Sequence, residues 1–426
     1  MRQPSGPAAP PAAQDPAVDT GVHAMDGRDA AAAWPRISAA DLEGLVAQAP
    51  ALARPLRILW HSPRPFSCAV RVQTARGPLF VKRHDRRVRD AAALLEEHRF
   101  IEQLGARGLA VPRLLAFARD GARLAGSTAL ETGTWTYEIH APAPGCDAYG
   151  AAHSWTPVRS AAHARALGAA LARLHVAAAD YRAAPRAVRP LIPSCDIVGA
   201  HDLAAGLDRF VALRPAVGRF LEQAGPAPAR IVDALAPWHA ALQPLLAQLA
   251  PSWVHNDWHA SNAFWTDDGP QAEVCCAIDF GLCNLGWAVA DLATALERNT
   301  VAWLDIAPDA SAEAHSATPG RVAARRAAGR PELAIALLGG YEAVRPLAPA
   351  ERAALPILLG LAHVEFALSE VDYFYGVLGD VEDARRACPG FLLGHVQWFT
   401  GVDGRAYLGA LSDALGLSGA PAPWRA

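Results

Sequence analysis

The chain has 426 residues, of which 52% are hydrophobic and 19% are charged, so it is long enough to form two packed lobes. The formal net charge of -3 and the lack of a long basic run argue against nucleic acid or an anionic membrane as a main partner. No apolar run approaches the roughly 18 residues that a membrane span needs. The seven cysteines are scattered and form no C-x-x-C motif, so we expect them to be reduced thiols in the cytoplasm.

The first part of the chain changes from a tail to a β-rich region. Residues 1–34 carry Pro, Ala and acids without a period and lack a secretory signal, so we expect a disordered tail. A short helix is expected from Ser38 to about Gln48. Residues 89–108 predict a second helix. Five strand-like runs surround that second helix, three before it and two after: LRILWH, CAVRVQT, PLFVKRH, VPRLLAFA and TWTYEIH.

A Pro/Gly break at APAPG, residues 141–145, separates this region from long Ala- and Leu-rich helical segments. The exceptions are the strand-like runs WVH, NAFW and VCCAIDF, of which the last two are joined by the turn TDDG. The expected fold class is therefore α+β and bilobal. A small antiparallel sheet with one helix, residues 35–140, precedes a larger helical lobe, residues 141–426.

The stretch WVHNDWHASNAFW concentrates polar residues between large aromatic ones. Asp257 and Asn262 are five positions apart, and Asp279 of the IDFG run follows seventeen positions later. A hairpin between them would let Asn262 and Asp279 face one point. Carboxylate and amide oxygens suit Mg²⁺, and Asp257 could then orient a hydroxyl toward whatever the metal holds.

These parts match the phosphoryl-transfer template of a loop Asp, a loop Asn and a D-F-G Asp. The template also requires a cation on the third strand, and PLFVKRH supplies Lys82. The following helix should offer a carboxylate to hold this lysine. Glu97 lies on the apolar stripe of that helix, so it is preferred to Glu96.

In these segments the chain resembles the aminoglycoside phosphotransferase and choline kinase-like family, the small-molecule branch of the protein kinase-like fold. The resemblance covers roughly Leu56 to Ala293. It is carried by FVKRH, LLEEHRFIEQL, VPRLL, APAPG, VHNDWHASN, IDFG and WAVADLA.

The resemblance implies that ATP, or GTP, binds between a nucleotide-binding lobe and a catalytic, substrate-binding lobe. It implies Asp257 as the catalytic base or orienter, Asn262 and Asp279 as Mg²⁺ ligands, and Lys82 with Glu97 at the phosphates.

Other roles rest on the resemblance alone. His259 would lie near the transferred phosphate. His140 to Ala143 match the adenine hinge, so Ala141 and Ala143 would meet the base through their backbone. Ser62 stands in the loop that would cover the phosphates, which lacks the usual glycines here.

Three alternatives are open. His255 and His259, with nearby cysteines, could form a zinc site, although the glutamate of H-E-x-x-H is missing. The chain could be a kinase-fold protein that binds nucleotide without catalysis. It could also phosphorylate protein Ser or Thr, as bacterial stress-response kinases do, although no APE signature follows Gly281.

The acceptor should be a small molecule with a hydroxyl, read by the helical part of the chain. Glu365, Glu370 and Asp372 could meet a cationic substrate such as an amino alcohol. We favour the simpler reading, in which these three acids are solvated helix residues.

Overall fold

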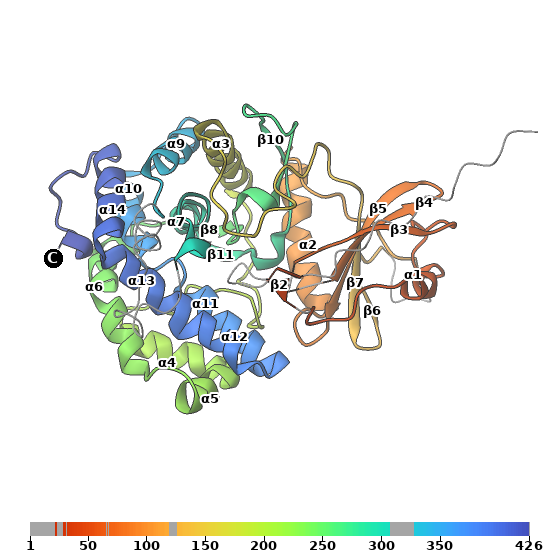
Figure 1. Ribbon diagram of the computed structural model, residues 1–426, viewed down its shortest axis with the longest axis horizontal. Coiled ribbons are helices and arrows are strands. Elements are labelled where there is room, and N and C mark those ends of the chain that lie inside the picture. The colour runs from red at the N-terminus through yellow and green to blue at the C-terminus, as the bar shows by residue number, and fades with distance from the viewer. Residues whose placement is uncertain are drawn as a thin grey trace, which may run out of the picture.

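The computed structural model describes residues 22–23, 29–30, 32–64, 66, 68–118, 126–306 and 328–425. A β-sheet occupies one end of the molecule and a large group of helices the other (Figure 1). Most of the expected tail, residues 1–34, lies outside the described residues. Within it, β1 (Val22–His23) pairs with β2 (Asp29–Ala30), and Trp34 is buried with its indole N–H donating to Tyr373.

The expected five-stranded antiparallel sheet is present, with the strand order β3-β4-β5-β7-β6. Its strands are β3 (Arg57–His61), β4 (Cys68–Thr74), β5 (Gly77–Asp85), β6 (Leu130–Thr132) and β7 (Trp135–His140). One expected strand is replaced: VPRLLAFA forms only an isolated bridge from Leu114 to His140, and β6 takes the fifth place. Pro112 at the start of that run lacks the N–H that a paired strand needs.

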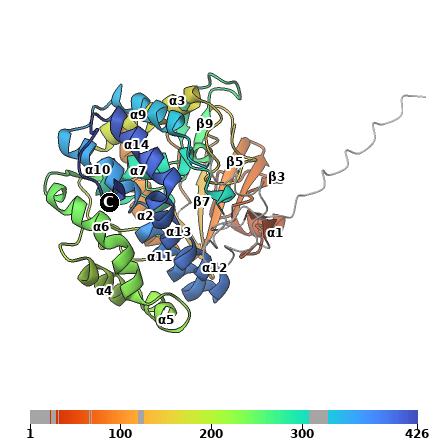
Figure 2. The same cartoon turned by 60° about the vertical axis from the view of Figure 1, so that its left-hand side comes forward.

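Two helices pack against this sheet. α1 (Ala39–Leu45) begins after its N-cap Ser38, close to the expected start, and buries two leucines against the sheet's apolar face. α2 (Ala91–Ala106) begins after Asp90, whose side chain accepts from the N–H of Ala93. In Figure 1 α2 lies between the sheet and the helical part. Figure 2 shows the sheet strands β3 and β5 again on the side away from α6 and α10.

Helices dominate the rest of the chain. Among the described residues they are α3 (Ala161–Ala178), α4 (Leu203–Leu213), α5 (Pro215–Gln223), α6 (Pro228–Leu246), α7 (Ala288–Thr300), α9 (Pro331–Glu342), α10 (Pro349–Leu359), α11 (Val364–Val371), α12 (Val381–Arg385), α13 (Leu392–Thr400) and α14 (Val402–Ala414). The helix expected over residues 209–223 breaks at Arg214, because Pro215 cannot continue it. α3 and α9 approach closely at Gly168 and Gly340, where a Cβ atom would lie 2.0 Å and 2.1 Å from a carbonyl oxygen of the other helix.

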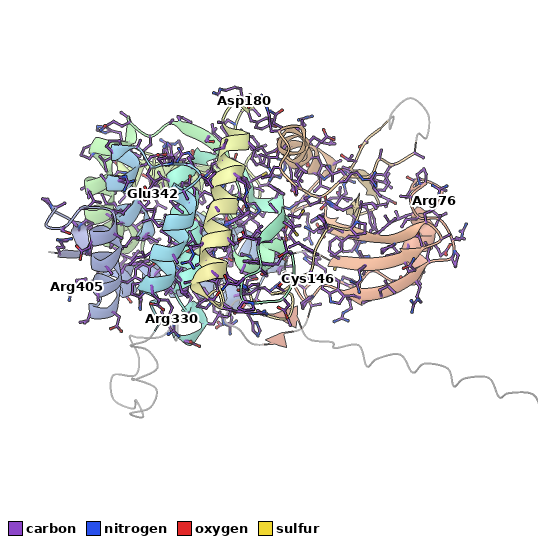
Figure 3. The ribbon with its side chains drawn as sticks, turned by 90° about the horizontal axis from the view of Figure 1, so that it is seen from above. Arg76, Cys146, Asp180, Arg330, Glu342 and Arg405 are labelled. Carbon is purple, nitrogen blue, oxygen red and sulfur yellow. The ribbon has the colours of Figure 1, made fainter. Side chains whose placement is uncertain are left out.

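Two short strand pairs lie among these helices. β9 (Ala263–Trp265) and β10 (Val274–Ala277) form the expected hairpin, and β8 (Pro251–Val254) pairs with β11 (Asn284–Trp287). The backbone of Cys146 forms a bridge to Trp265 of β9, and Figure 3 places Cys146 between the helical part and the sheet. The loops at the ends of these pairs therefore lie where the two parts of the molecule meet.

Within the described ranges, no single helix is long and apolar enough to cross a membrane, although the bent pair Pro349–Leu359 and Val364–Leu378 passes by length and composition.

Candidate active site

A cavity of about 120 Å³ collects side chains that are far apart in the sequence. It is lined by six of the nine site residues expected from the sequence: Lys82, Glu97, Asp257, His259, Asn262 and Asp279. Lys82 comes from β5, Glu97 from α2, and the other four from the loops around the β9–β10 hairpin. The fold thus brings the sheet, its helix and the polar stretch of the helical part to one place.

The loop before Asp257 is held by a buried acid. Asp291 of α7 is 0% exposed, and its carboxylate accepts from the backbone N–H groups of His255 and Asn256, both at 2.8 Å. The Nε2 of His175 also lies 3.0 Å from this carboxylate. Asn256 has a left-handed backbone with φ of 61°, which turns the chain sharply toward Asp257.

Asp257 is surrounded by donors. The Nδ2 of Asn262 donates to the backbone carbonyl of Asp257 at 2.8 Å and to its Oδ2 at 3.0 Å. The guanidinium of Arg298 contacts the other carboxylate oxygen, Oδ1. The Nε2 of His259 lies 3.5 Å from the same Oδ1. The carboxylate is thereby fixed in one orientation at the cavity.

Lys82 forms an ion pair across the two lobes. Its Nζ lies 2.9 Å from Oδ1 of Asp279, which has a left-handed backbone with φ of 59°. Burial raises the pKa of Asp279, but the charge and hydrogen bond of Lys82 outweigh burial and leave that pKa below its usual value. Burial lowers the pKa of Lys82, and Asp279 with two further acids raises it above the usual value. Both groups are therefore charged at neutral pH.

Glu97 is buried, as its place on the apolar stripe of α2 predicted. The expected Lys82–Glu97 ion pair is replaced, since Lys82 pairs with Asp279, and Glu97 Oε2 lies 3.9 Å from Nη2 of Arg186. Glu97 still adds to the negative potential that raises the pKa of Lys82. Glu96, the less favoured alternative, pairs with Arg189 at 3.0 Å.

His259 is buried and uncharged. Burial, and then the charge of Arg64, lower its pKa to about 3. Its Nδ1 lies 2.9 Å from the hydroxyl of Ser261, so this contact holds the ring in place. A neutral imidazole supplies a hydrogen-bonding group to the cavity but no positive charge.

Three expected residues do not line the cavity. The N–H of Ser62 donates to Ala69, and its hydroxyl accepts from the N–H of Arg64. The N–H of Ala141 donates to the carbonyl of Arg113 at 2.9 Å, so it is already engaged. Ala143 lies two residues further along the same segment. From the loop of Ser62, it is the Arg64 side chain that reaches the cavity, and its Nη1 donates to Ser154.

The expectation that the C-terminal acids are solvated helix residues is wrong for two of them. Glu365 and Glu370 of α11 are 4% and 0% exposed, and all the other residues of α11 are buried as well. Glu370 lines the cavity together with Phe366 of the same helix. Arg298 was not expected from the sequence, because none of the motifs includes it.

A buried acid in the sheet was missed as well. Glu138 of β7 lies next to Lys82 in the strand register. Its two carboxylate oxygens lie 2.8–3.0 Å from the Nε2 atoms of His84, His98 and His140. Its negative charge reaches Lys82 and raises the pKa of that lysine.

The zinc alternative is not supported by the contacts of His255. Its Nε2 lies 3.0 Å from the carbonyl oxygen of Ile278, and its Nδ1 accepts from the N–H of Asp257 at 3.2 Å. Both ring nitrogens are therefore engaged within the loop.

Comparison with known proteins agrees with this geometry. Residues 67–335 match the phosphotransferase enzyme family, a range that runs from β4 through the cavity loops into α9. The chain belongs to that family. This phosphotransferase is 32% identical over 310 residues to a homoserine kinase of Xanthobacter autotrophicus, covering 70% of this chain and 75% of the relative. It is 30% identical over 310 residues to a homoserine kinase of Acidiphilium cryptum, covering 70% and 76%.

The fold of this phosphotransferase is similar to that of an aminoglycoside phosphotransferase from Alicyclobacillus acidocaldarius. The TM-score is 0.50 at 16% identity, with 90% of this chain and 97% of the other covered. The expected bilobal, kinase-like fold and the family resemblance are confirmed. The protein is a kinase, of a family that uses ATP, and it phosphorylates a hydroxyl of a small molecule.

Proposed function

We propose that this phosphotransferase moves the γ-phosphate of ATP, or of GTP, to the hydroxyl of a small amino compound, with L-homoserine as the first acceptor to test. The observation that carries the proposal is one cavity lined by Asp257, Asn262, Asp279 and Lys82. The choice of homoserine comes from the two homoserine kinases that the chain resembles over 70% of its length.

Asp257 is the residue that we assign to the acceptor hydroxyl. Its carboxylate accepts a hydrogen bond from that hydroxyl and aims the oxygen at the phosphorus atom. Asn262 and Arg298 already bind its two oxygens and restrict its rotation. Positioning of this kind supplies much of the rate in phosphoryl transfer, which needs little covalent help from the protein.

The donor set fits Mg²⁺. Because Asn262 uses its Nδ2 on Asp257, its Oδ1 is the atom that remains for a cation. Asp279 is ionised, and hard oxygen donors of this kind are what Mg²⁺ binds. When bound, the ion would neutralise charge on the phosphates. Asn262 and Asp279 would hold it.

The nucleotide contacts follow from the same arrangement. Lys82 is charged and faces the cavity, so we assign it to the phosphates, with Glu97 and Glu138 as the acids behind it. Neutral His259 would hydrogen-bond the transferred phosphate. Since the N–H of Ala141 is engaged, the base would meet the carbonyl of Ala141 and the N–H of Ala143.

The test is a turnover screen with Mg²⁺ and ATP or GTP over hydroxyl compounds, including L-homoserine, 3-aminopropan-1-ol, choline, an aminoglycoside and a casein control. Nucleoside diphosphate release and the phosphorus NMR spectrum of the product are measured. A phosphomonoester of a small compound is expected. ATP binding without any product would favour the non-catalytic reading, and transfer to casein alone would favour the protein-kinase reading.

A further inference from the structure

Three polar side chains meet inside the helical part of the molecule, and none of them lines the cavity that contains Asp257. Glu297 lies in α7, His363 directly precedes α11, and His395 lies in α13. They are 2%, 4% and 4% exposed. One carboxylate oxygen or ring nitrogen from each residue lies within 4.8 Å of those from the other two. Three segments that are far apart in the sequence thus bring these groups to one buried point.

Most polar atoms of this group have no hydrogen-bond partner. Among the described residues, both ring nitrogens of His363, both of His395 and the Oε2 of Glu297 form no hydrogen bond. The Nδ1 of His395 lies 2.8 Å from Oε1 of Glu297 and the Nδ1 of His363 lies 3.6 Å from it, but in neither contact is a hydrogen bond formed. Buried polar groups are almost always hydrogen-bonded, so this many unpaired atoms in one place indicate a bound group.

The spacing of the three residues fits the ligands of one small cation. In proteins Zn²⁺ lies about 2.0–2.2 Å from histidine nitrogens and carboxylate oxygens, so ligand atoms at the tetrahedral angle are about 3.3 Å apart. The contacts of 2.8 Å and 3.6 Å to Oε1 of Glu297 lie on either side of that value. Two imidazoles and one carboxylate favour Zn²⁺, whereas Mg²⁺ and Ca²⁺ prefer oxygen ligands alone. A water molecule would complete the tetrahedral coordination.

Aromatic side chains hold the two imidazole rings in place. The ring of His395 stacks on that of Trp303, with the centroids 3.6 Å apart. The ring of His363 meets the ring of Trp155 edge-on at 5.6 Å and that of Phe391 at 6.0 Å. Ligands whose orientation is fixed before the ion arrives lose little freedom when they bind it.

Arg298 carries a positive charge close to this group, and its position is compatible with a bound cation. Its Nε lies 3.9 Å from Oε2 of Glu297, whereas both histidine contacts are made to Oε1. The Nη1 of Arg298 contacts Asp257 at the cavity. Glu297 thus presents one oxygen to Arg298 and the other to the histidines, and Asp257 offsets part of the charge of Arg298.

We infer that Glu297, His363 and His395 form a buried Zn²⁺ site that fastens α7 to α11 and α13. The site is structural, because its ligands do not line the cavity and come from three separate parts of the helical region. α7 also carries Asp291, which holds the loop that presents the catalytic carboxylate, so the ion stabilises the helix on which that loop depends. The inference goes beyond the proposed function and does not depend on it.

The first test is the zinc content of the full-length protein, expressed with zinc in the medium and measured by plasma mass spectrometry. The protein is first dialysed against excess Mg²⁺ without a chelator, so that Mg²⁺ occupies the oxygen ligands of the cavity. About one zinc per chain is expected for the original protein, and less than about 0.2 for His395→Phe and for Glu297→Gln. His395→Phe keeps a ring against Trp303 but removes both nitrogens.

His239→Phe in α6 is the matched control and should retain the zinc of the original protein. His239 is 5% exposed, and the carbonyl of Ala200 that it contacts also accepts from Gln243. If the original protein holds no zinc, or if His395→Phe and Glu297→Gln hold as much as the control, the inference is wrong.

Two measurements on the original protein keep the inference testable if the variants do not fold. X-ray absorption at the zinc edge should show two histidines, with nitrogen and oxygen ligands at about 2.0–2.2 Å and no sulfur at about 2.3 Å. Sulfur ligands would assign the zinc to cysteines and overturn the inference. In Mg²⁺-free buffer, EDTA should lower the urea midpoint after full equilibration, because the site exists only in the folded chain. A midpoint that EDTA leaves unchanged would also overturn it.

Discussion

The carboxylate of Asp291 accepts a hydrogen bond from the backbone N–H of His255 at 2.8 Å. It connects a helix of the C-terminal part with the loop that presents Asp257, and the same carboxylate also binds the next N–H in the loop. The side chain is fully buried, so both bonds are shielded from water. Loop geometry at the cavity therefore depends on one buried acid that touches no substrate in our proposal.

Replacing that acid by its amide should weaken both the fold and the reaction. In Asp291→Asn, one of the two loop N–H groups faces an NH₂ group and loses its acceptor. We expect a loss of about 2–4 kcal/mol in the free energy of unfolding, since a buried hydrogen bond is lost and a donor is left unpaired. Urea unfolding measures it, and kcat should fall while the KM for ATP changes little.

The control for this variant is Asp268→Asn. Asp268 is an aspartate whose side chain is 69% exposed and pairs with Arg159 at the surface. Its stability should stay within about 0.5 kcal/mol of the original protein. An Asp291→Asn variant as stable and as active as this control would contradict the role that we give to Asp291.

Removing the carboxylate that we assign to the acceptor hydroxyl should act on the rate alone. Asp257→Asn keeps the size of the side chain and can still accept from Asn262, but it loses the charge that holds Arg298. We expect kcat to fall by about 10²–10⁴-fold. The dissociation constant for a non-hydrolysable ATP analogue, measured by calorimetry, should stay within about 2-fold. Turnover close to that of the original enzyme would remove Asp257 from the mechanism.

The sequence could predict those parts of the site that depend on local order. Asp257, Asn262 and Asp279 are positioned by one hairpin and one tight turn, and the hairpin follows from two strand-like runs with a TDDG turn between them. The period of α2 placed Glu97 on the buried face for the same reason. Local spacing decides these positions, so no tertiary contact had to be known.

The pairing of charges could not be predicted in this way. Whether Lys82 pairs with Glu97 or with Asp279 depends on how the two parts of the molecule pack against each other. In the structure Lys82 forms its ion pair with Asp279. Glu370 could not be recognised as buried, because the helix period of α11 shows apolar residues on several faces and only the surrounding helices determine that no face is solvated. The pairing of β8 with β11 likewise joins segments that the sequence gives no reason to connect.

Removal of the cation should stop turnover. Chelation by EDTA is expected to abolish activity, and excess Mg²⁺ should restore it. In Asn262→Ala the Mg²⁺ concentration for half-maximal rate should rise by about 10-fold or more, because a ligand is lost and Asp257 also loses a donor. Ser261→Ala, next to it in the loop, removes a contact to His259 instead and should leave the Mg²⁺ dependence unchanged. Equal Mg²⁺ curves for the two variants would argue against Asn262 as a ligand.

The last prediction concerns acid stability and His259. Its pKa is lowered to about 3 in the folded protein, while an unfolded chain has the usual value of about 6.5. As the pH falls below about 6.5, the unfolded chain therefore binds a proton that the folded protein refuses, and stability is lost between about pH 6.5 and pH 3. In His259→Asn this part of the loss disappears. Urea unfolding at pH 7 and pH 4.5 should show a smaller drop for His259→Asn than for the original protein, whereas His201→Asn at the surface should show the original drop. A drop of the same size in all three proteins would mean that His259 is protonated in the folded state at pH 4.5.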